Sequence, residues 1–176
     1  RYAESQDFGG EISGNAFLKK ITEDISTGLS TEEEKLSAIH NYVRNNYAWD
    51  GSYRKFTERP LRKVFDEKKG NAAELNLLLG SMLEKQNISV SPVLISTRNH
   101  GFVRENIPLS SQFNYTILIA KIGEKSYLLD ATEKLLPLGM LPERCLNGKG
   151  LVISKLGHGW INLTSPLRSK QSYNIE

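Results

Sequence analysis

The feature that most constrains the fold is a strongly marked helix start near the middle of the chain. Gly70 ends a charged run, Asn71 can accept a backbone N–H of the first turn, and Glu74 stands where a capping box requires it. Apolar residues then recur at helical spacing: Leu75, Leu78, Leu79, Met82 and Leu83. The pattern predicts a helix with one buried apolar face. Because a helix start presents free N–H groups and partial positive charge, a cysteine there would be an activated nucleophile, but this chain has Ala72.

Helical patterns come first along the chain and strand patterns come later. Helices are expected over about 16–28, from Thr31 to Tyr47, and over 60–68. Strands are expected at 88–97, 113–122, 126–129, 151–153 and 160–163. This order predicts an α+β domain in which N-terminal helices pack on an antiparallel sheet.

The composition limits the class of protein. The chain has 176 residues, 39% of them hydrophobic and 24% charged, which fits one globular domain over 1–176. The 23 basic residues are scattered and the net charge is +3, which argues against a nucleic-acid partner. No apolar run approaches the ~20 residues of a membrane helix. The chain begins at Arg1 in polar sequence without a signal peptide, so we expect a mature form or a domain excised from a longer protein.

The segment order, together with the Leu128–Thr132 segment, resembles the bacterial transglutaminase-like superfamily, which has a papain-like fold. The resemblance covers about residues 32–153. In active members a cysteine stands at the helix start, a histidine follows on a later strand, and an aspartate follows after a hairpin. The resemblance implies a thiolate that attacks a carbonyl, a histidine that moves the proton and an aspartate that orients the histidine.

Carried onto this chain, the resemblance places Ala72 at the nucleophile position, Tyr115 at the base position and Asp130 at the aspartate position. Alanine has no nucleophilic atom, and tyrosine, with an ordinary pKa of about 10, is a poor base near pH 7. A shift of one residue would bring Asn114 to the base position, and asparagine is no better a base. We therefore predict that the domain is not an enzyme. Asp130 is expected either to accept a hydrogen bond from Tyr115 or to cap the turn that follows it.

Two classes of function remain open. The first is a catalytically inactive module that binds a peptide, a glycan or a neighbouring domain in the vestigial cleft. Its candidate binding residues are Trp49, Tyr53, Asn71, His100, Asn114 and Tyr115. The second is a cryptic cysteine hydrolase or acyltransferase in which Cys145 works with His100. An open groove in front of Ala72 would favour binding, and side chains filling that space would favour a structural spacer.

Neither a metal nor a cofactor is expected. The chain has three histidines and one cysteine, and their spacing matches no set of metal ligands. Three segments, 92–101, 112–115 and 141–148, resemble a subgroup of large exported bacterial proteins. In that subgroup the transglutaminase-like domain lies between two β-rich domains of unknown function. The resemblance implies a periplasmic or cell-envelope location, with the neighbouring β-rich domains as partners.

Overall fold

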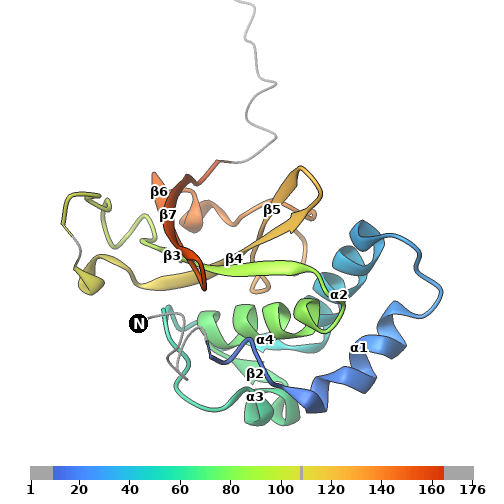
Figure 1. Cartoon of the computed structure of the whole chain (residues 1–176). Helices are drawn as coiled ribbons and strands as arrows, with labels where there is room; N and C mark the ends of the chain where they lie inside the picture. Colours follow the sequence, from blue (N-terminus) through green and yellow to red (C-terminus); the bar gives the residue numbers. More distant parts are fainter. Residues whose placement is uncertain (1–9, 108, 165–176) are drawn as a thin grey trace, which may run out of the picture.

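The computed structural model describes residues 10–107 and 109–164, in which a layer of helices packs against one sheet (Figure 1). The helices are η2 (Ala16–Leu18), α1 (Lys19–Ser26), α2 (Glu32–Asn46), α3 (Leu61–Glu67), α4 (Ala72–Glu84), η3 (Ser110–Gln112) and η4 (Glu143–Cys145). The strands are β1 (Ala48–Trp49), β2 (Lys69–Gly70), β3 (Ser89–Ile95), β4 (Tyr115–Ile122), β5 (Lys125–Leu129), β6 (Lys149–Ser154) and β7 (Gly157–Asn162). The predicted α+β class, with helices on an antiparallel sheet, is confirmed.

Local capping signals set the starts of the two longer helices. Thr31 and Glu34 form a complete capping box before α2, and Asn71 and Glu74 form one before α4. Each box satisfies two backbone N–H groups that the helix leaves without a partner. Both starts therefore fall where the sequence predicts them.

The central helix α4 differs from the prediction, because it is buried on all sides. Every residue from Ala72 to Leu83 is buried, so the expectation of a single buried face is wrong. The reason is that α2 and α3 pack against α4 from one side and β3 and β4 from the other. Gly80 allows the close approach to the sheet, since a Cβ there would lie 3.3 Å from the methyl carbons of Leu118.

The larger sheet has the strand order β5-β4-β3-β6-β7, and all neighbours are antiparallel. β3 pairs with β4 from Ser89 to Ile95 but with β6 only at Val93 and Leu94. β6 and β7 form a hairpin along their whole length. The short strands β1 and β2 run parallel and set Trp49 beside Gly70, immediately before α4.

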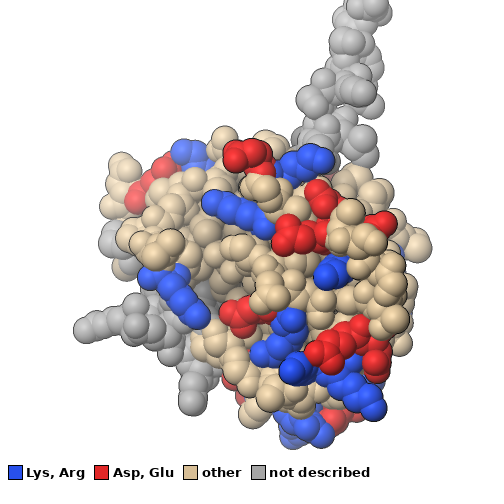
Figure 2. Space-filling model, turned by 45° about the vertical axis from the view of Figure 1, so that its right-hand side comes forward, with Lys and Arg blue, Asp and Glu red and all other residues tan. Residues whose placement is uncertain are grey.

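The described surface carries charges of both signs. On the face shown in Figure 2, basic and acidic side chains lie close together, as expected from their scatter in the sequence. Within residues 10–107 and 109–164, no helix is long and apolar enough to span a membrane.

Candidate functional site

The start of α4 is closed by a segment of the same chain. Ala72, the first residue of the helix, is fully buried, and its N–H donates to the carbonyl of Ser52 at 3.2 Å. The indole Nε1 of Trp49 donates to the same oxygen at 3.2 Å. Asn71 accepts the N–H of Glu74 with its Oδ1 at 2.9 Å. The resemblance places a catalytic nucleophile at this helix N-terminus. In this chain the carbonyl of Ser52 lies in front of it and accepts the N–H of Ala72.

Tyr115 and Asp130 form a buried pair. The hydroxyl of Tyr115 donates to Asp130 Oδ2 at 2.7 Å and lies 3.0 Å from Thr132 Oγ1. Asp130 Oδ1 also accepts the backbone N–H of Thr132 at 2.7 Å and its hydroxyl at 2.6 Å. Both alternatives left open for Asp130 are therefore realised at once. Burial, followed by the charge of Asp130, raises the pKa of Tyr115 well above its ordinary value, so this hydroxyl is a donor and not a base.

Cys145 lies in the same apolar cluster as Ala72 and Tyr115 and is fully buried. Its Sγ is 3.6 Å from Asp130 Oδ2. Burial and then the carboxylate charge raise the pKa of the thiol well above its ordinary value, against the opposing charge of Arg144. The arrangement holds a protonated thiol at neutral pH.

Aromatic rings and one guanidinium cover this cluster. Trp49 and Tyr53 stack with their centroids 5.6 Å apart, and Tyr53 meets Tyr115 edge-on at 5.6 Å. The guanidinium of Arg144 lies 4.5 Å from the centroid of Trp49 and donates to Thr132 Oγ1 at 2.6 Å. Side chains thus fill the space in front of Ala72. Thr132 and Arg144 were not among the predicted site residues. Thr132 follows Asp130 by two positions, and Arg144 directly precedes Cys145.

The other candidate binding residues are engaged elsewhere. Asn114 accepts the N–H of Thr97 at 2.9 Å and donates to its hydroxyl at 2.8 Å. His100 Nε2 lies 2.9 Å from the carbonyl of Ser111, at the end of the same loop. In the part of the chain that the structure describes, no hydrogen bond joins His100 to Cys145. The structure therefore brings Trp49, Tyr53 and Tyr115 together with Asn71 and leaves His100 apart.

His40, on α2, contacts the backbone of Asp130, the acidic member of the buried pair with Tyr115. Its Nε2 lies 3.0 Å from the backbone carbonyl of Asp130. Burial lowers the pKa of His40 to about 4, although the hydrogen bond to that carbonyl opposes the shift. No group of three or more histidine, cysteine, aspartate or glutamate side chains among the described residues could hold a metal ion.

Comparison with known proteins agrees with this architecture. The model of the transglutaminase-like superfamily matches residues 19–114, more than half of the chain. A solved structure of a candidate protease from Parabacteroides distasonis ATCC 8503 has a TM-score of 0.61 and 15% identity, covering 87% of this chain and 28% of that one. A candidate cysteine protease from Cytophaga hutchinsonii has a TM-score of 0.51 and 14% identity, covering 83% of this chain and 46% of that one. No curated protein was found to match.

The two structural matches bear on the fold alone at these identities. This chain corresponds to less than half the length of either matched protein. Its helices and sheet are those of a transglutaminase-like, papain-like fold.

Proposed function

Because this chain belongs to the transglutaminase-like superfamily, we propose that it is a catalytically inactive member that acts as a binding or interdomain interaction module. The observation that carries the proposal is the identity of the residues at the start of α4 and on β4. Ala72 stands where the resemblance requires a thiol, and Tyr115 stands where it requires a base. Of the three positions, only Asp130 keeps a group suited to the cysteine mechanism.

Because side chains fill the space in front of Ala72, the closed site favours a structural role between domains over binding of a ligand in the cleft. Ala72 and Tyr115 are fully buried beneath the stack of Trp49 and Tyr53, so a peptide or glycan would have to displace these rings to reach them. A neighbouring domain needs no such opening, since it can bind the outer surface. We therefore place contact with neighbouring β-rich domains of a longer exported, cell-envelope protein first among the proposed roles. This setting rests on the resemblance of three sequence segments.

A cysteine hydrolase or acyltransferase centred on Cys145 is the second candidate function. In its favour, Cys145 Sγ lies 3.6 Å from the retained carboxylate of Asp130, and the matched structures are described as candidate proteases. Against it, the thiol is fully buried and its pKa is raised, whereas a catalytic cysteine needs a lowered pKa. His100, the predicted partner of Cys145, instead has its Nε2 within hydrogen-bond distance of the carbonyl of Ser111.

The reactivity of Cys145 separates the two functions. We expect an aromatic disulfide reagent at pH 7 to label the native chain no faster than the chain unfolds, and to label it rapidly in denaturant. Hydrolysis of a casein-derived peptide and amine incorporation into it should equal those of the Cys145→Ser variant. Fast labelling of the native thiol, together with an activity that Cys145→Ser removes, would overturn the inactive assignment.

A further inference from the structure

The first half of β3 has no neighbouring strand on one side. β3 pairs with β4 from Ser89 onward, but it meets β6 only at Val93 and Leu94. Pro92 has no backbone N–H to donate, and β6 ends at Ser154 and turns into β7. On that side, the backbone groups from Ser89 to Ser91 have no ladder partner in the described part of the chain. Such a strand edge is a template for a further strand.

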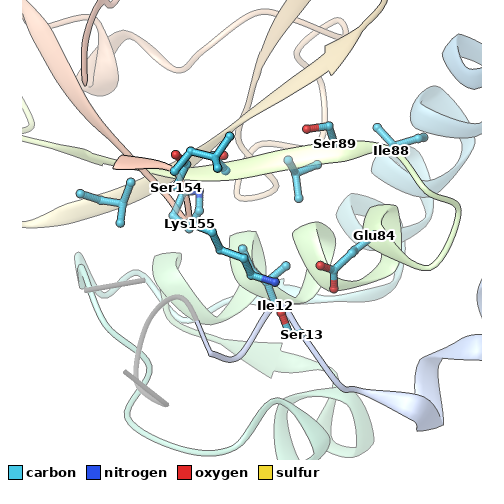
Figure 3. Close-up of a pocket in the computed structure, with 12 residues that line it drawn as sticks. Ile12, Ser13, Glu84, Ile88, Ser89, Ser154 and Lys155 are labelled. Atoms are coloured by element: carbon cyan, nitrogen blue, oxygen red, sulfur yellow. The ribbon is translucent and has the colours of Figure 1, made fainter. Parts of the chain in front are cut away.

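A cavity of about 260 Å³ lies along this edge, between the sheet, the end of α4 and the segment before α1 (Figure 3). Its apolar lining consists of Ile12, Ile88, Val90, Pro92, Ile153 and Leu156. The side chain of Leu156 is completely exposed at the rim, in the turn between β6 and β7. The volume is below the range of most drug-sized ligand sites, and it suits the side chains of a short peptide.

Two opposite charges belong to the lining of the cavity. Glu84 projects from the last turn of α4, and Lys155 reaches in from the turn after β6 (Figure 3). Among the described residues neither side chain has an ion-pair partner. An occupant that carries both a cation and an anion would therefore complement the lining.

We propose that this groove binds an extended peptide segment of a partner protein, which adds a short strand to β3 where β6 leaves it. The backbone of the peptide pairs with Ser89–Ser91, an apolar side chain enters the cavity, and charged side chains meet Glu84 and Lys155. The lining residues are distinct from those around Ala72, so this proposal goes beyond the function proposed above and does not depend on it.

Charge order provides the test. Two capped pentapeptides, acetyl-Lys-Val-Thr-Val-Glu-amide and acetyl-Glu-Val-Thr-Val-Lys-amide, have the same composition and opposite polarity. Titration followed by NMR should show that the chain prefers one of them by about fivefold or more, since two ion pairs differ between the complexes. Exchanging the charges, Glu84→Lys with Lys155→Glu, should invert the preference. The matched exchange Glu124→Lys with Lys125→Glu, at two exposed residues where the β4–β5 turn enters β5, should leave it unchanged.

Backbone methylation distinguishes strand addition from simple ionic contact. Every second residue of a strand directs its N–H toward a given neighbour. Methylating one of two adjacent amides in the preferred peptide should therefore abolish binding, and methylating the other should preserve it. The proposal fails if neither peptide binds below about 10 mM, if the preference survives the Glu84 and Lys155 exchange, or if both methylations act equally. A dimer of the chain that the peptides dissociate would assign the groove to a second copy and would also overturn it.

Discussion

At the scale of single residues, the candidate site is built around the carboxylate of Asp130. It accepts hydrogen bonds from the hydroxyl of Tyr115, from the backbone and hydroxyl of Thr132, and from the thiol of Cys145. A buried charge is tolerated only where such donors replace water. The carboxylate that the resemblance assigns to orienting a histidine thus has another physical role, which is to hold β4, the turn after β5, and η4 together.

Removing the hydroxyl of Tyr115 should therefore cost stability. We expect Tyr115→Phe to lower the free energy of unfolding by about 1–3 kcal/mol, because a buried carboxylate loses a donor. Urea titration measures the change. Tyr127→Phe is the matched control, since Tyr127 is a partly buried tyrosine of β5 with no hydroxyl hydrogen bond among the described residues, and it should change stability by less than about 0.5 kcal/mol. Equal effects of the two substitutions would refute the role given to Tyr115.

At the scale of elements, the central part of the sheet depends on the close approach of β6 to β3. Gly150 lies in β6, and a Cβ at this position would stand 2.6 Å from Cγ1 of Val93 and 3.1 Å from Cγ2 of Ile95. Real Cβ atoms essentially never approach another atom to 2.6 Å, and a distance of 3.1 Å is tighter than most contacts. Both contacts are with buried branched side chains. Gly159, on β7, has no atom within 4 Å of such a Cβ.

This contrast gives a matched pair of substitutions. Gly150→Ala should lower the free energy of unfolding by about 1–3 kcal/mol, because the added methyl group overpacks the sheet. Gly159→Ala should be within about 0.5 kcal/mol of the unchanged chain. Thermal and urea unfolding of both variants would measure the difference. A Gly150→Ala variant as stable as Gly159→Ala would show that β6 can shift away from β3 at no cost.

The same elements show which features the sequence can predict. The starts of α2 and α4 are local, since Thr31 with Glu34 and Asn71 with Glu74 satisfy neighbouring N–H groups. Strands were predicted at 151–153 and 160–163, where β6 and β7 lie, but their pairing as a hairpin was not. The turn between them lacks the usual Asn-Gly or Asp-Gly signal. The central place of β3 depends on pairings between distant segments, which no local pattern records.

The candidate site likewise has a part that the sequence predicts and a part that it does not. Ala72, Tyr115 and Asp130 were placed from short segments that resemble a family, and the structure brings Tyr115 and Asp130 within hydrogen-bond distance. The stacking of Arg144 on Trp49 joins segments far apart in the chain, and the approach of Cys145 to Asp130 depends on the path of the irregular segment between them. Such contacts arise from tertiary packing and have no periodic signature in the sequence.

At the scale of the whole molecule, polar side chains of two helices hold the segment that follows β5. Asn76, on α4, donates to the carbonyl of Thr116 at 2.8 Å and accepts the N–H of Ala131 at 2.7 Å. Arg44, on α2, donates to the carbonyl of Leu136. His40, one turn earlier on α2, contacts the carbonyl of Asp130. The helical layer and the sheet are thus joined by specific hydrogen bonds as well as by apolar packing.

His40 makes this connection sensitive to pH. Burial lowers its pKa to about 4 from an ordinary value of 6.5, the nearby charge of Arg44 adds to the shift, and the bond to Asp130 opposes it. Between pH 4 and pH 6.5 the unfolded chain binds more protons at His40 than the native chain does. The stabilisation that depends on neutral His40 is therefore fully present above pH 6.5 and is lost as the pH falls toward 4. By pH 4.5 the loss from this group should be about 2 kcal/mol or more.

The variant His40→Gln should remove this dependence. Glutamine can still donate to the carbonyl of Asp130 but does not titrate. The free energy of unfolding of the variant should therefore fall less steeply than that of the unchanged chain between pH 7 and pH 4.5. Urea titrations at several pH values measure both slopes, and the difference cancels the carboxylates that the two chains share. His100→Gln, a change at an exposed histidine, should keep the original slope. If His40→Gln and the unchanged chain lose stability in parallel, then protonation of His40 does not loosen the contact between α2 and Asp130.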